Sequence, residues 1–175
     1  MDRRLHIGGL SPAEGWEIFN ALPGEHVDHL GNALDLSRFA DDTFAALYAS
    51  HVLEHFDYKD ALQQVLLEWK RVLKPGGKIH ISVPDMDILS RLFLSKDQIN
   101  VDERFHIMRM MFGGHINEYD YHLVGFDQDI LLDFMSVAGF TDFSRMTDFG
   151  LFEDTSRYKF RGVPISLNIL AHKPT

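Results

Sequence analysis

The sequence contains no cysteine among its 175 residues, which excludes disulfide bonds and thiol-based catalysis. It also contains no apolar run near the roughly 20 residues that a membrane-spanning helix requires. Basic residues are in the minority, since 17 lysines and arginines face 26 aspartates and glutamates, for a formal net charge of -9. This charge repels phosphate backbones and anionic lipids, and no basic patch is visible, so we expect neither nucleic acid nor membrane as a partner.

The first residues lack the apolar core of a secretory signal, so the expected location is the cytoplasm. The length suits a single domain, residues 1–175, with enough chain to bury a core without disulfides or structural metals. The content of 45% hydrophobic and 25% charged residues is ordinary for a soluble globular protein.

Apolar patterning predicts seven strands and four helices. The strands are expected at 5–7, 16–19, 27–30, 44–50, 78–85, within 143–152 and at 165–171. The helices are expected at 58–73 with Asp57 as N-cap, from Asp85 to about 93, at 101–112, and between Asp127 and Gly139. The segment 153–164 looks irregular.

This order predicts an α/β fold: a doubly wound, Rossmann-like, mostly parallel seven-stranded sheet with one antiparallel strand and helices on both faces. Only residues 8–15 connect the first two strands, whereas a parallel crossover normally takes a dozen residues or more. The first crossover helix is therefore expected to be a single turn or absent.

Ligands of such sheets bind beyond the carboxyl ends of the strands. Gly8 and Gly9 follow the first strand and allow close approach of the backbone, but they do not complete G-x-G-x-x-G, and a plain tight turn explains them as well. Other strand ends carry Asn20, Asn32 with Ala33, and Ser50 with His51.

The stretch "GNALDLSRFADDTFAALYASHVLEHF", followed by an amphipathic helix that ends in "EWKRVLKPGGKIHISVPD", resembles the class I S-adenosylmethionine-dependent methyltransferases, in particular the small bacterial branch related to the type 11 domain. The resemblance covers residues 5 to about 85 by motif and the remainder by element order. It implies S-adenosylmethionine as cofactor and methyl transfer to an acceptor as the activity.

The resemblance also implies roles for the residues at the strand ends. Gly8 and Gly9 would approach the amino-acid portion of the cofactor, and Asn20 would face the ribose hydroxyls. Asn32 and Ala33 would lie at the adenine edge. Ser50 and His51 would form the floor of the pocket near the sulfonium.

Several positions depart from the family pattern. The glycine loop is shortened, and amides or alanine replace the acidic residues expected at Asn20, Asn32 and Ala45. A carboxylate makes stronger hydrogen bonds to ribose hydroxyls than an amide does, so the pattern predicts cofactor affinity weaker by about an order of magnitude. A binding or scaffold protein with this fold and no activity is therefore an alternative.

The polar loop of residues 113–126 offers candidates for a catalytic base. We predict His122 as the base, with Asp120 or His115 as the group that orients it. The alternative for each of the three is a hydrogen bond within its own loop.

The segment "HVLEH", from His51 to His55, also matches H-x-x-E-H, a zinc-peptidase signature. In a zinc hydrolase His51 and His55 would bind the metal and Glu54 would be the base, with His115 and His122 as further ligands. The segment follows a strand instead of lying within a long helix, which argues against this alternative and for a role of Glu54 and His55 in the strand-to-helix turn. NAD-dependent oxidoreduction is less favoured still, because the third glycine is missing.

The acceptor is not identified by any motif. Its contacts are expected from residues 113–126, from 153–164 or from a second subunit. A pocket without a lid would favour a saccharide-linked or protein-linked acceptor over a small metabolite. Phe149, Leu151 and Phe152 form either a homodimer patch or part of the core.

Overall fold

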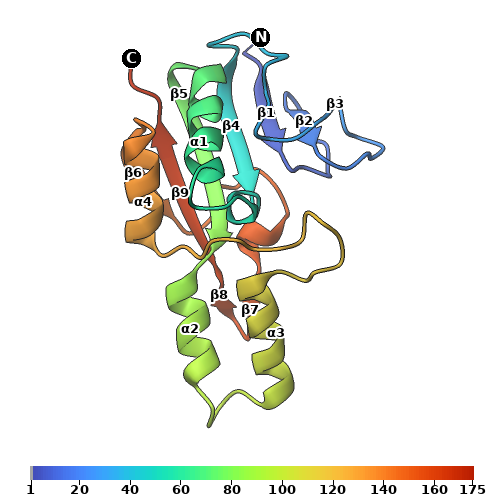
Figure 1. Ribbon diagram of the computed structural model, residues 1–175, viewed down its shortest axis with the longest axis vertical. Coiled ribbons are helices and arrows are strands. Elements are labelled where there is room, and N and C mark those ends of the chain that lie inside the picture. The colour runs from blue at the N-terminus through green and yellow to red at the C-terminus, as the bar shows by residue number, and fades with distance from the viewer. Residues whose placement is uncertain (1) are drawn as a thin grey trace.

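The computed structural model describes residues 2–175, which fold around one mixed sheet (Figure 1). The strands of this sheet are β1 (Arg4–Ile7), β2 (Glu17–Asn20), β3 (His29–Leu30), β4 (Phe44–Ser50), β5 (Leu73–Pro84), β6 (Thr141–Met146) and β9 (Ser166–His172). The helices are η1 (Leu53–His55), α1 (Ala61–Val72), α2 (Met86–Leu94), α3 (Val101–Phe112), α4 (Gln128–Val137) and η2 (Thr155–Arg157). A small hairpin joins β7 (Lys159–Phe160) to β8 (Val163–Pro164).

The sheet has the order β3-β2-β1-β4-β5-β9-β6. β1 pairs in parallel with β2 and β4, and β4 pairs in parallel with β5. Only β9 runs antiparallel to its neighbours β5 and β6. The predicted Rossmann-like sheet with seven strands, one of them antiparallel, is confirmed. The chain between β1 and β2 forms no helix, so the expected loss of the first crossover helix is confirmed as well.

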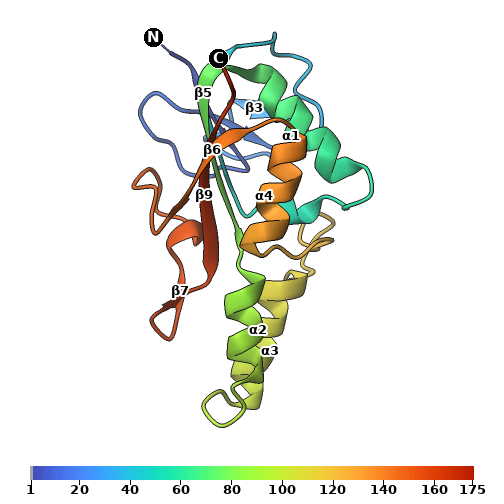
Figure 2. The ribbon, with the colours of Figure 1, turned by 90° about the vertical axis from the view of Figure 1, so that its left-hand side faces the viewer.

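The main core lies on the face of the sheet that α1 and α4 cover (Figure 2). Alternate strand residues such as Leu5, Leu47 and Ile79 point into it and are fully buried. α1 contributes one apolar stripe that includes Trp69, as the 3.6-residue pattern predicted. Its indole N–H donates a hydrogen bond to the Ala33 carbonyl at 3.0 Å, which ties the chain after β3 to this helix.

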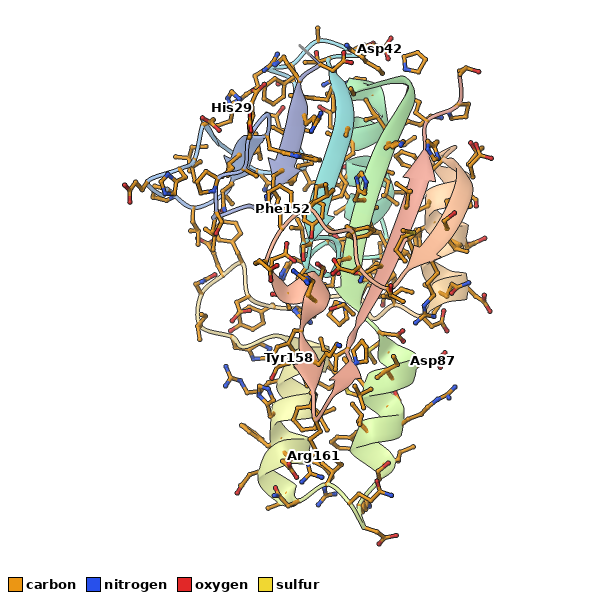
Figure 3. The ribbon with its side chains drawn as sticks, turned by 180° about the vertical axis from the view of Figure 1, so that it is seen from behind. His29, Asp42, Asp87, Phe152, Tyr158 and Arg161 are labelled. Carbon is orange, nitrogen blue, oxygen red and sulfur yellow. The ribbon has the colours of Figure 1, made fainter. Side chains whose placement is uncertain are left out.

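Aromatic side chains cover the opposite face of the sheet. Phe152 packs on the rings of His6 and Tyr48, with centroid distances of 4.0 and 4.6 Å (Figure 3). Phe149 packs edge-on against Tyr48, whose hydroxyl donates a hydrogen bond to Asp154 at 2.9 Å. The expectation of helices on both faces is wrong, because the chain between β6 and β9 covers this face with a loop.

α2 and α3 form an antiparallel pair beyond the carboxyl end of β5 (Figure 1). They share a second, smaller core with the β7–β8 hairpin, which includes Leu89, Ile107 and Phe160. α3 begins at a capping box in which Asn100 and Glu103 bond each other's backbone N–H groups. The predicted bounds 101–112 are confirmed.

Two expectations about local structure need correction. Asp57 is not the N-cap of α1, because its carboxylate caps a preceding turn and the helix begins at Ala61. The strand expected within 143–152 starts earlier, at Thr141, because Gly139 at φ 86° ends α4 and turns the chain directly into β6.

No helix in the described part of the chain is long and apolar enough to span a membrane.

The three residues predicted as either a homodimer patch or part of the core, Phe149, Leu151 and Phe152, differ in burial. Phe152 is buried and Phe149 is half-buried against the sheet, so the core alternative holds for these two. Leu151 is exposed. A homodimer stays a prediction.

Burial of His6 predicts a pH dependence of stability. Burial lowers the pKa of His6 from 6.5 to about 4. The unfolded chain therefore binds a proton at this residue between pH 6.5 and 4 that the folded chain does not, and stability falls as the pH falls through this window, by about 3 kcal/mol. In urea unfolding, the free energy of unfolding of the His6→Phe variant should fall less than that of the wild type over this window, by the same amount.

The matched control is His26→Phe, which changes an exposed loop histidine. It should keep the wild-type pH dependence. Equal slopes for the His6→Phe variant and the wild type would contradict the expectation.

Candidate functional site

A cavity of about 380 Å³ lies where β1 to β4 reach their carboxyl ends. This volume falls in the range of small-molecule sites. Of the predicted cofactor-binding residues, five line it: Gly8, Asn20, Asn32, Ala33 and His51. They come from four separate strand ends, which parallel pairing brings to one edge. Gly9 and Ser50 lie next to the cavity and do not line it.

Asn20 holds the glycine loop in place. Its side-chain N–H donates a hydrogen bond to the Gly9 carbonyl at 2.9 Å, and its side-chain oxygen accepts one from the Leu22 N–H at 2.9 Å. An amide offers a donor and an acceptor together, whereas an ionised carboxylate only accepts, so the structure gives a reason for asparagine at a position where the family pattern predicts an acid. The role of Asn20 at the ribose stays a prediction.

Two glycines allow the backbone to approach neighbouring side chains closely. Gly8 has φ 78°, and a Cβ at this position would come within 2.5 Å of Val52. A Cβ on Gly31 would come within 2.9 Å of Phe19. Packing against these side chains thus requires glycine, and both glycines also line the cavity, so its wall has main chain at these two positions.

His51 sits at the end of β4 with φ 54°, an uncommon conformation for a residue other than glycine. Its N–H donates a hydrogen bond to the Ser82 carbonyl on β5 at 2.8 Å, which holds this conformation. The ring nitrogen Nε2 lies 2.9 Å from the Ser166 hydroxyl, and Nδ1 lies 3.4 Å from Glu54 Oε1. His51 thus connects the cavity to a buried carboxylate.

Glu54 is only 1% exposed, and three histidines surround it. His122 places Nε2 3.8 Å from its Oε1, and His55 lies within the same cluster. Burial raises the pKa of Glu54, but the nearby His51 ring and the charges of the histidines lower it by more, so the net direction is down. Burial lowers the pKa of His122, and the carboxylate of Glu54 partly offsets this.

The backbone of Glu54 also positions the loop that carries His122. Its carbonyl accepts hydrogen bonds from the Leu123 and Val124 N–H groups at 2.8 and 3.3 Å. The His122 N–H donates to the Phe112 carbonyl at 3.1 Å, at the end of α3. Glu54 lies in the strand-to-helix turn, as we expected. The sequence suggested His122 beside it only as a further ligand in the zinc alternative, because the HVLEH motif itself does not contain His122.

The other predicted catalytic residues serve their own loop. Asp120 accepts a hydrogen bond from the Ile116 N–H at 3.3 Å. His115 donates to the Phe112 carbonyl at 2.9 Å and stacks on Tyr121 at 4.1 Å. The structure brings Glu54, and neither Asp120 nor His115, next to the ring nitrogen of His122. The role of His122 as base stays a prediction.

A second cavity, of about 320 Å³, adjoins the first. His51 lines both cavities, and the second is also lined by His122 and by Tyr158, which lies directly before β7. Both segments that were expected to contact an acceptor, 113–126 and 153–164, contribute to this wall.

Comparison with known proteins agrees with this arrangement. The family model described as a methyltransferase domain matches residues 20–81, from the end of β2 into β5. A comparison with curated proteins finds no match. The chain has the fold of the class I methyltransferases. The resemblance seen in the sequence is thereby confirmed.

Solved methyltransferase structures are similar over the whole chain. A SAM-dependent methyltransferase from Archaeoglobus fulgidus is 16% identical, with a TM-score of 0.63 over 98% of this chain and 86% of that one. The 1,6-didemethyltoxoflavin N1-methyltransferase of Burkholderia thailandensis, with its substrate and S-adenosylhomocysteine bound, is 14% identical, with a TM-score of 0.60 over 99% and 72%.

Other matched chains are longer than this one. The chain spans 62% of a Bordetella parapertussis protein described as a possible exported protein, with 13% identity and a TM-score of 0.59 over 99% of this chain. It spans 49% of the CurJ carbon methyltransferase structure. The chain therefore spans less than two thirds of the length of each of these two matched chains.

The two bonds of Asn20 predict the effect of an acid at this position. Asn20→Asp keeps the acceptor for Leu22 but places a carboxylate oxygen against the Gly9 carbonyl. We expect the free energy of unfolding in urea to fall by about 1–3 kcal/mol.

Asn32→Asp is the matched control, because the exposed Asn32 uses only its oxygen, to accept from the Leu34 N–H at 3.0 Å. It should change stability by about 0.5 kcal/mol or less. An equal loss in both variants would show that the bond to Gly9 is not the cause.

Proposed function

We propose that the protein is a methyltransferase that uses S-adenosylmethionine, and that the first cavity binds this cofactor. The observation that carries the proposal is the convergence of Gly8, Asn20, Asn32, Ala33 and His51 on one cavity of suitable size. The family resemblance implies a cofactor role for each of them. The methyltransferase-domain match over residues 20–81 covers all of these positions except Gly8.

The shape of the cavity wall suits the parts of this cofactor. Main chain at Gly8 and Gly31 lines the cavity, and the amino-acid and ribose portions would contact it there. Apolar groups at Ala33 and Leu34 offer a surface for a flat base, and the amide of Asn32 offers a hydrogen-bonding edge. His51 lies at the side of the cavity that faces the second cavity.

We place the acceptor in the second cavity. His51 lines both cavities, so an acceptor atom there approaches the cofactor past one side chain. When bound, S-adenosylmethionine supplies a methyl group from its sulfonium, and the electron pair of the broken S–C bond stays on sulfur. The chain has to align the acceptor for in-line attack and exclude water, and positioning supplies most of the acceleration.

An oxygen or nitrogen acceptor also loses a proton. His122 lines the second cavity beside Glu54, so it is the histidine we propose as the base. For the acceptor we propose a group linked to a saccharide or a protein. We also propose that the protein forms a homodimer and is located in the cytoplasm. Each follows from the sequence expectations above.

A scaffold protein without activity is the main alternative, and cofactor binding distinguishes the two. Calorimetric titration with S-adenosylmethionine and S-adenosylhomocysteine, in the presence of a chelator, should give micromolar dissociation constants. NAD should not bind. Ala21→Trp, which places an indole in the first cavity, should weaken binding by about tenfold or more.

Ala40→Trp is the control, since Ala40 is exposed and lies outside the cavity wall. It should bind like the wild type. If folded wild-type protein binds neither sulfur compound up to millimolar concentration, the enzyme proposal fails and the scaffold alternative takes its place.

A further inference from the structure

Three electron-pair donors meet between the two cavities. Glu54 and His55 come from η1, and His122 comes from the loop between α3 and α4. One ligand atom from each residue lies within 4.8 Å of the other two. His55 lines the first cavity and His122 lines the second, so the cluster is reached from both.

Backbone carbonyls fix the protonation of the two imidazoles. His55 Nδ1 lies 3.0 Å from the Tyr121 carbonyl, and His122 Nδ1 lies 3.2 Å from the Met111 carbonyl. A carbonyl only accepts hydrogen bonds, so each Nδ1 carries the proton, and the lone pair of each neutral ring is on Nε2. For His122 this lone pair lies on the atom that is 3.8 Å from Glu54 Oε1.

The third neighbour of the carboxylate, His51, presents a lone pair as well. The Ser166 hydroxyl donates its proton to the Thr155 carbonyl at 2.9 Å, so it accepts from His51 Nε2. In the neutral ring Nδ1 is then unprotonated, and it lies 3.4 Å from Glu54 Oε1. Within the described chain, neither oxygen of this buried carboxylate has a hydrogen-bond partner of normal geometry.

The arrangement of His51 and His122 around the Glu54 carboxylate requires a positive charge among these groups. A buried carboxylate without hydrogen bonds is costly, and lone pairs of two neutral imidazoles facing it add repulsion. Either a proton on one of the rings or a metal ion removes the conflict. The orientation of the His55 and His122 rings favours a metal. Histidines that bind metals typically donate their other N–H to a carbonyl or carboxylate, as these two do.

We infer that Glu54, His55 and His122 form a binding site for a divalent transition-metal ion of the zinc type. Two imidazoles and one carboxylate are a ligand set that zinc accepts, and three protein ligands leave a coordination position for water or a substrate oxygen. Atoms within 4.8 Å of one another have a common point within about 3 Å, against zinc–ligand bonds of roughly 2.1 Å, so side-chain movements of under about 1 Å complete the site.

The site differs from the peptidase signature in its geometry. That signature needs two histidines one turn apart on a helix, with the glutamate as base. Here His51 directly follows β4, and Glu54 is itself a ligand in a 3-10 turn. The third ligand, His122, lies outside the motif. The metal therefore belongs to the wall between the two cavities and gives no support to a peptidase.

The use of the ion rests on the proposed methyltransferase function. A metal-bound acceptor hydroxyl loses its proton to solvent water more readily, because the ion stabilises the negative oxygen. That oxygen forms the bond to the methyl carbon as the S–C bond breaks. With the ion bound, His122 is a ligand and does not act as the base, so metal binding and the base role exclude each other.

The test measures zinc directly, on full-length protein from which any affinity tag has been removed. Chelator-treated protein is titrated with Zn²⁺ in competition with a chromophoric chelator, and zinc bound after dialysis is counted by mass spectrometry. We expect one zinc per chain. Glu54→Gln and His122→Ala should each weaken zinc binding by about tenfold or more.

His26→Ala is the matched control, because His26 is an exposed histidine in the loop after β2. It should bind zinc like the wild type. Cobalt(II) substitution gives a second measurement, since a low-symmetry site with imidazole ligands produces visible absorption bands that the Glu54→Gln and His122→Ala variants should lose. Thermal unfolding of each variant checks that it is folded.

The outcome is separate from that of the proposed function, because cofactor binding is measured in the presence of chelator. A protein that binds S-adenosylmethionine and no zinc overturns the metal site alone. Zinc binding unchanged in folded Glu54→Gln and His122→Ala variants overturns it too. Either result would mean that a proton holds the cluster together.

Discussion

Parallel pairing of β1 with β2 and β4 fixes where the candidate site lies. The register sets Leu5 beside both Glu17 and Leu47, so the three strands end at one edge of the sheet. Each strand then turns within one or two residues of its end, at Gly8, Asn20 and His51. A shift of one residue in this register would move the side chains of a strand to the opposite face and take the cavity apart.

The missing crossover helix has a structural consequence on the other face of the sheet. Without it, this face is covered by aromatic rings instead of a helix, and Phe152 packs on His6 and Tyr48. The hydrogen bond from Tyr48 to Asp154 holds the loop in place at its far end. The same loop continues through Thr155 into the wall of the second cavity. The cover of the sheet and the acceptor wall are therefore parts of one segment.

Sequence patterns predicted the elements whose signal is local. Caps at Asp85 and Asp127 and the apolar residues of 101–112 place three helices, and alternation places the second half of β5, although this strand begins earlier, at Leu73. The strand ends that line the first cavity follow from the same reasoning, because parallel strands share an edge. The cover of the second face was not predictable, because the loop of 147–158 carries no periodic signal and its aromatics fit a surface patch equally well.

The cluster around Glu54 shows why residue spacing alone could not assign chemistry. The HVLEH motif contains two of the donors, but its spacing suggests His51 as the partner of His55. The positive φ of His51 and the bond to Ser166 fix that ring with Nε2 toward Ser166, so His51 is not one of the three donors that meet. His122 takes its place only because the Glu54 carbonyl binds the Leu123 N–H. Backbone hydrogen bonds near the strand end thus determine which side chains meet at this site. A five-residue motif does not reveal those bonds.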